Sequence, residues 1–68
     1  MVNLEKVDEV KVYVYRDGLL YRTEKFNSLQ LSHRYIQRQL LMGYSCTMER
    51  LENGRAWATL KFWPKESM

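Results

Sequence analysis

The side chains that could take part in catalysis or metal binding are few and far apart along this 68-residue chain. His33 and Cys46 are the only histidine and the only cysteine, so they cannot complete a tetrahedral zinc site. Nucleophilic catalysis needs a nucleophile, a base and an orienting group, and the pattern shows no such set. The carboxylates stand singly, and no glycine-rich loop precedes a helix. We therefore expect no enzymatic activity, no cofactor and no metal.

Aromatic and cationic side chains remain as candidates, and they alternate along segments that the pattern predicts to be strands. Rings interleaved with cations on an open sheet are typical of single-stranded nucleic-acid-binding domains, where bases stack on the rings and cations follow the phosphates. Tyrosine, tryptophan and arginine also dominate protein interfaces. A third reading is that these residues only stabilise the sheet. The expected face consists of Lys11, Tyr13, Tyr15, Arg22, Arg55, Trp57, Lys61 and Trp63.

A second candidate surface lies on the helix that we predict over residues 28–42. Its apolar stripe should pack on the sheet, which leaves Arg34, Gln37 and Arg38 directed to solvent. This polar face could dock on an acidic groove, or it could simply be solvated.

Two strands and a tight turn are predicted in the first part of the chain. Asp17-Gly18 tolerates the positive φ of a two-residue hairpin turn, and valine alternates with Lys and Tyr over residues 10–15. A two-residue loop brings opposite charges and an arginine–tyrosine pair together on the outer face. The expected cross-strand pairs are Val14 with Tyr21, Val12 with Thr23, Tyr15 with Leu20, Lys11 with Glu24, and Tyr13 with Arg22.

The predicted helix has signals at both ends. Asn27 is the expected N-cap, with Gln30 completing a capping box, and Phe26 and Leu31 are spaced as a hydrophobic staple. Gly43 is placed to end the helix in a left-handed conformation. The stripe expected to face the sheet is Leu29, Ser32, Ile36 and Leu40, with Leu31 and Tyr35 beside it.

A second hairpin is predicted around Asn53-Gly54. A three-residue loop over 52–54 with a bulge at Gly54 separates apolar from polar side chains, whereas a two-residue loop mixes them. Pro64 should end the last strand. The expected inner face combines Tyr44, Cys46 and Met48 with Ala56, Ala58, Leu60 and Phe62.

The composition describes one globular domain spanning residues 1–68, with frayed ends at about residues 1–6 and 65–68. The fold class is α+β: a two-layer ββαββ domain with a four-stranded antiparallel sheet and one helix on one face. The strand order is not predicted. A net charge of +3 permits nucleic acid or an acidic protein surface as partner and requires neither.

The expected location is the cytoplasm. A lone cysteine cannot form an intramolecular disulfide, residues 1–9 have no long apolar run, and no run of apolar residues is long enough to span a membrane.

A helix opening with Ser28-Leu29, a hairpin turn at Asn53-Gly54 and a tryptophan shortly after it resemble small phage-encoded inhibitors, including some type I anti-CRISPR proteins. The resemblance concerns topology and spacing over about half of the chain. It implies a non-enzymatic protein that blocks a host defence or transcription component in the host cytoplasm by occupying its surface. No binding residue is carried over from it.

These observations favour a small binding protein that acts on another protein, one with an acidic or nucleic-acid-handling surface. The alternative is a single-stranded nucleic-acid-binding domain that uses the aromatic and basic sheet face. Self-association through the same face or a sheet edge, giving a homodimer, is a further option.

Overall fold

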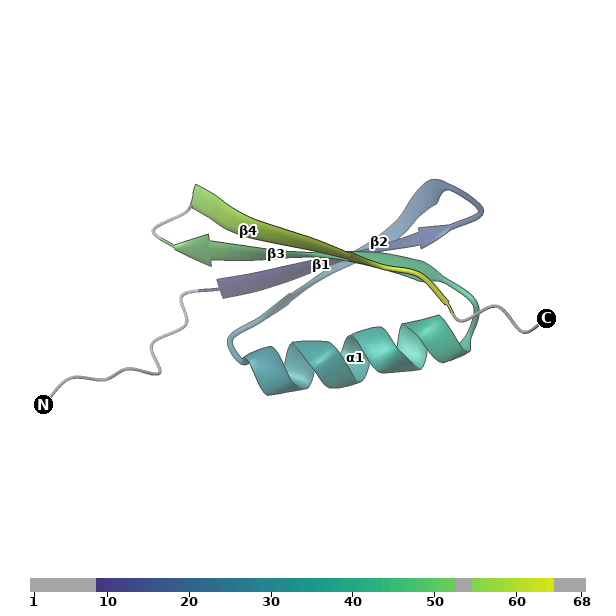
Figure 1. Cartoon of the computed structure of the whole chain (residues 1–68), viewed down its shortest axis with the longest axis horizontal. Helices are drawn as coiled ribbons and strands as arrows, with labels where there is room; N and C mark the ends of the chain where they lie inside the picture. The colour runs from purple at the N-terminus through teal and green to yellow at the C-terminus, as the bar shows by residue number, and fades with distance from the viewer. Residues whose placement is uncertain (1–8, 53–54, 65–68) are drawn as a thin grey trace, which may run out of the picture.

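The fold is described from a computed structural model, which describes residues 9–52 and 55–64. In this part of the chain an antiparallel sheet of four strands is covered on one face by one helix, which confirms the predicted ββαββ architecture (Figure 1). The elements are β1 (Glu9–Arg16), β2 (Leu19–Phe26), α1 (Leu29–Leu41), β3 (Ser45–Glu52) and β4 (Arg55–Phe62).

The strand order in the sheet is β2-β1-β3-β4. The two hairpins therefore lie side by side, joined by antiparallel pairing of their first strands, β1 and β3. β2 and β4 form the two edges of the sheet. The helix crosses the inner face, where it packs mainly on β1, β2 and β3 and touches β4 at Phe62.

The core lies between α1 and the two central strands. Its fully buried hydrophobic residues are Val10, Val12, Val14, Ile36, Cys46 and Met48. This confirms that the valines of β1 and the predicted helical stripe face each other. One detail differs from prediction, since Leu31 is exposed. Gln39, which the predicted stripe does not include, is buried.

The first hairpin turns where predicted, with positive φ at Asp17 and Gly18. Tyr15 pairs with Leu20 as expected, but a β-bulge follows and shifts every later pair by one residue. Four of the five expected pairs are therefore wrong. The observed partners are Val14 with Arg22, Tyr13 with Thr23, Val12 with Glu24, Lys11 with Lys25, and Val10 with Phe26.

The bulge has a clear physical reason. Without it, Lys25 would lie opposite Val10, below the helix, and Phe26 would lie on the outer face. With it, Phe26 joins the core and its ring lies 5.3 Å from that of Tyr35, centroid to centroid. The burial of a phenylalanine in place of a lysine stabilises the shifted register.

The helix begins one residue later than its predicted cap. The N-cap is Ser28, not Asn27, and its hydroxyl accepts a hydrogen bond from the backbone N–H of Leu31 at 3.2 Å. Phe26 packs on Tyr35 rather than forming a staple with Leu31. The other end is as predicted: Gly43 has φ +92°, and its N–H donates to the carbonyl of Leu40.

The second hairpin confirms the predicted separation of faces. Phe62 lies opposite Cys46, and Leu60 lies opposite Met48. The predicted three-residue loop over 52–54 is wrong, because Glu52 pairs with Arg55 and two residues separate them. The extra residue is in β4, where the register shifts between Ala56 and Ala58. Ala56 is therefore paired with Leu51 and not with the core side of β3.

Some predictions fall outside the described residues. These are the frayed ends at residues 1–6 and 65–68 and the bulge at Gly54.

Candidate binding surfaces

The outer face of the sheet, which points away from α1, is left open by the elements of Figure 1. Lys11, Tyr13 and Tyr15 alternate with the buried valines of β1 and are half-buried between the neighbouring strands. This places three of the eight predicted face residues in a row along a central strand, as expected.

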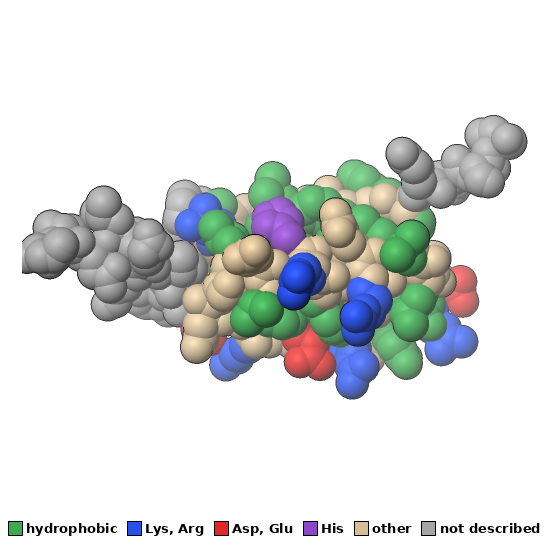
Figure 2. All heavy atoms as spheres, turned by 90° about the horizontal axis from the view of Figure 1, so that it is seen from below, with side chains coloured by type: hydrophobic (Ala, Val, Ile, Leu, Met, Phe, Trp, Pro, Cys, Tyr) green, Lys and Arg blue, Asp and Glu red, His purple; other side chains and the backbone are tan. Residues whose placement is uncertain are grey.

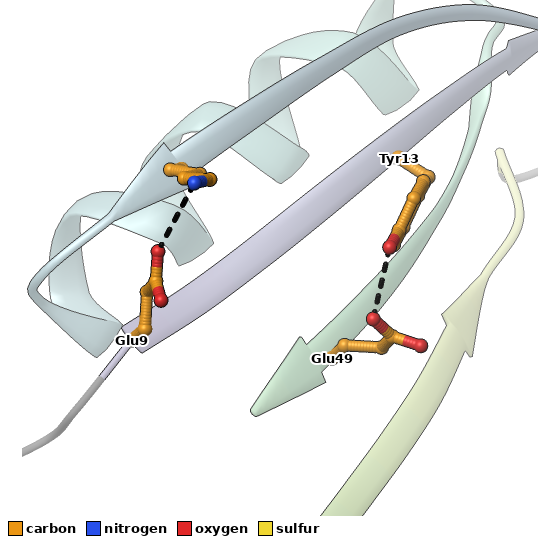
Figure 3. A network of polar contacts seen from close by, with 4 residues as sticks. Glu9, Tyr13 and Glu49 are labelled. Carbon is orange, nitrogen blue, oxygen red and sulfur yellow. Dashed lines mark hydrogen bonds and ion pairs between the residues drawn. The ribbon is translucent and has the colours of Figure 1, made fainter. Parts of the chain in front are cut away.

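Tyr13 is held in place by two neighbours. Its hydroxyl donates a hydrogen bond of 2.9 Å to Oε1 of Glu49 on β3, which Figure 3 shows from close by. The ammonium group of Lys11 lies 5.5 Å from the centre of the Tyr13 ring, within cation–π range. The Glu49 carboxylate and the Lys11 ammonium group therefore both interact with Tyr13 within the domain.

The edge of this face beside β2 is also internally paired. Lys25 lies opposite Lys11, and its ammonium group is 3.5 Å from a carboxylate oxygen of Glu9 (Figure 3). Since Glu9 and Glu49 both belong to this face, its charge is mixed. A mixed face attracts a polyanion less than the cations alone would.

Three predicted members of the face need separate comment. Arg22 was predicted wrongly, because the bulge in β2 turns it to the helix side, where its Nε lies 3.3 Å from Glu24 Oε2. Arg55 was also predicted wrongly, because the register shift in β4 places it opposite Glu52 on the helix side, where it is exposed next to the turn of the second hairpin. Trp57 lies in β4, but its side chain is outside what the structure describes.

The remaining two predicted residues, Lys61 and Trp63, meet Tyr15 at one end of the sheet. Tyr15, Lys61 and Trp63 line a hollow of about 380 Å³, together with Ser45 and Thr47. One cation and two aromatic side chains from β1, β4 and the segment after β4 therefore converge. This is the part of the predicted platform that the fold assembles.

A second hollow lies on the other side of Trp63. It has a volume of about 450 Å³ and is lined by Gln37, Leu40, Leu41 and Trp63. We call these four residues the Trp63 corner. Trp63 is 68% exposed and Leu41 is 88% exposed, so two large apolar side chains stand in solvent beside one concave surface.

Figure 2 looks onto α1 from the side away from the sheet, and hydrophobic side chains gather at the C-terminal end of the helix. Arg34, Gln37 and Arg38 are exposed, as predicted for the helix face. Of these three residues, only Gln37 lines a hollow that also contains a predicted sheet-face residue, Trp63. Leu41 is also exposed, and no local pattern in the sequence indicates that Trp63 lies beside it.

His33 and Cys46, the side chains best suited to catalysis or metal binding, occupy structural positions. His33 contacts the ring of Phe62 edge to face at 6.3 Å. Cys46 is buried, and burial raises the pKa of its thiol, which keeps it protonated and unreactive. Among the described residues, no three of the His, Cys, Asp and Glu side chains are grouped closely enough to hold a metal ion.

Within the described ranges, α1 is too short and too polar to cross a bilayer. Comparison of the chain with protein-family models, with curated proteins and with solved structures found no match.

Proposed function

We propose that this protein is a non-enzymatic binding domain that takes a protein partner at the Trp63 corner. The observation that carries the proposal is the pairing of two exposed apolar side chains, Leu41 and Trp63, across one hollow. Single exposed hydrophobic residues are common on protein surfaces, but a tryptophan beside a concave apolar surface is typical of an interface hot spot.

The surroundings of the corner support this proposal. Leu40 continues the apolar surface towards the core, and Gln37 supplies a polar rim. Such an arrangement offers a partner an apolar centre bordered by hydrogen-bonding groups. The domain would act by occupying its partner's surface, as the resemblance to phage-encoded inhibitors implies. A cytoplasmic setting suits the free thiol of Cys46.

The test uses a display library of random peptides selected on the immobilised protein. Selected peptides should bind wild-type protein and lose at least about tenfold in affinity on Trp63→Ala, since hot-spot truncation costs about 2 kcal/mol or more. Leu19→Ala is the matched control, because Leu19 is 73% exposed and lies on β2, the opposite edge strand of the sheet.

The control should leave binding unchanged, and both variants should keep the wild-type unfolding midpoint, because neither side chain is in the core. Peptides that bind wild-type and Trp63→Ala equally well would show that the corner is not the binding site.

A second candidate function is the binding of single-stranded nucleic acid by the outer face. The observation in its favour is the convergence of Tyr15, Lys61 and Trp63 on one hollow. Mixed-sequence single-stranded DNA and RNA should then quench tryptophan emission, with an effect that fades as salt rises. Quenching that is lost in Lys61→Glu would favour this function over the first, and no quenching at low salt would reject it.

A further inference from the structure

The two edges of the sheet are closed in different ways. Each cross-strand row on the helix side begins at β2 and ends at β4. The rows are Arg22-Val14-Cys46-Phe62, Glu24-Val12-Met48-Leu60 and Phe26-Val10-Arg50-Ala58. Two of these three rows thus begin with a charged residue at β2, and all three end with an apolar residue at β4. A shorter row beyond them pairs Glu52 with Arg55.

The β2 edge is protected by charge. Arg22 and Glu24 point to the helix side and pair with each other at 3.3 Å, while Lys25 occupies the outer side. Charged side chains that point inward on an edge strand oppose pairing with another strand, because the added strand would desolvate them.

From Ala58 to Phe62 the β4 edge lacks such protection on its helix side, because the one helix-side charge of the strand, Arg55, lies beyond the register shift next to the turn. Leu60 is 50% exposed, although Val12 and Met48 in the same row are 0% and 2% exposed. The helix packs mainly on the other three strands and touches β4 through the contact between His33 and Phe62, while Leu60 in the neighbouring row stays exposed. An apolar strip therefore borders a backbone edge that has no paired strand among the described residues, and it continues into the Trp63 corner one residue beyond β4.

The charge of β4 indicates what would pair with it. Its eight residues contain two cations, Arg55 and Lys61, and no acid. Arg55 lies opposite Glu52, but Lys61 lies opposite Thr47, and no ion pair to Lys61 is found among the described residues. A segment with carboxylates on its outer side and apolar residues on its helix side would complement this edge.

We propose that β4 receives an extended segment of the partner protein as a fifth strand, and that this segment alternates acidic with apolar residues. Main-chain hydrogen bonds to the outer backbone edge of β4 would supply affinity. Contacts with Leu60 on the helix side and with Lys61 on the outer side would supply specificity. The proposal rests on the proposed function, since the same partner would reach the adjoining Trp63 corner.

Charge also argues against a second copy of the chain as the occupant. Pairing β4 with its own copy would bring two further cations and no carboxylate to the seam. Like charges close together across paired strands are destabilising.

The first probe is a blocked peptide of alternating valine and glutamate, with the eight residues of β4 as its length. Binding should slow hydrogen exchange of β4 backbone amides, followed by NMR, and leave β2 amides unchanged. Two analogues carry N-methyl groups on alternate residues, in the two possible phases. One phase removes the N–H groups that face β4, so it should bind at least about tenfold more weakly than the other.

The second arm reverses one charge. Lys61→Glu should bind the glutamate peptide at least about tenfold more weakly and should prefer a valine–lysine peptide. Arg16→Glu is the matched control, because it makes the same change in net charge at an exposed position at the end of β1. The control should keep the preference for glutamate.

The outcomes separate this inference from the proposed function. In one outcome, display peptides still depend on Trp63, but both N-methyl analogues bind alike and hydrogen exchange of β4 is unchanged. Strand addition is then wrong, and the proposed binding site at the Trp63 corner is retained. Failure of the glutamate peptide to bind wild-type protein also overturns strand addition. If β4 protection rises with protein concentration alone and sedimentation shows a dimer, the occupant is a second copy and the inference is wrong.

Discussion

Tyr13 and Tyr35 show how the same side chain acquires different roles on the two faces of the sheet. On the outer face, the Tyr13 hydroxyl donates to Glu49 and remains near water. On the inner face, the Tyr35 hydroxyl is buried and finds no hydrogen-bond partner among the described residues. Burial raises the pKa of Tyr35, and the nearby Glu24 carboxylate adds to the increase, while Arg22 opposes it.

We expect Tyr35→Phe to leave the free energy of unfolding unchanged or slightly higher, because it removes a buried polar atom that has no partner. Tyr13→Phe should instead lower it by about 0.5–1.5 kcal/mol, the usual net value of one hydrogen bond. Urea unfolding at neutral pH measures both. A larger loss for Tyr35→Phe than for Tyr13→Phe would contradict this assignment.

The same pair of variants gives a test in alkali. Because the pKa of Tyr35 is raised in the folded state, its contribution to stability is complete below its ordinary pKa of 10.0 and is lost as pH rises above that value. Wild-type protein and Tyr13→Phe should show this loss. Tyr35→Phe should show less of it.

Among the elements, the helix start is the simplest to test. Ser28→Ala should lower the free energy of unfolding by about 0.5–2 kcal/mol, because its hydroxyl is the acceptor for the Leu31 N–H. Asn27→Ala should change it by less than about 0.5 kcal/mol, since Asn27 is exposed and outside the cap. Thermal or urea unfolding compares the two. The reverse order would restore Asn27 as the cap.

Element types could be predicted from the sequence because each has a local cause. The positive φ of Gly18 and Gly43, the alternating valines and the helical spacing all act within a few residues. The register of β2 could not be predicted in this way. A bulge moves one residue out of the pairing, while side chains still alternate between the two faces before it and after it. Its cause is the contact between Phe26 and Tyr35, which belongs to another element.

The residues of the candidate site divide in the same way, into those placed by local pattern and those placed by contact between elements. The placement of Tyr13 and Tyr15 on the outer face could be predicted from alternation alone. The Trp63 corner could not, because it needs both the strand order and the position of α1 over the sheet. Neither the bulge in β2 nor the exposed edge of β4 can be predicted from the composition of a single segment.

For the molecule as a whole, stability depends on a small core. A domain of 68 residues has a free energy of unfolding of roughly 3–10 kcal/mol. Ile36→Ala should remove about 2–5 kcal/mol, because Ile36 is 1% exposed and packs on both central strands. Leu41→Ala, at an 88% exposed position, should change stability by less than about 0.5 kcal/mol. Circular dichroism on heating measures both, and equal losses would contradict the described core.

The strand order also bears on how the chain reaches its native state. β1 has its first neighbour within the local hairpin, but its second, β3, comes only after the whole of β2 and α1. The hydrogen bond between Tyr13 and Glu49 spans 36 positions in sequence. Closing so long a loop costs entropy before the central contacts form, so the docking of the two hairpins is the step we expect to limit the folding rate. During synthesis, the central pairing must wait until β3 has left the ribosome.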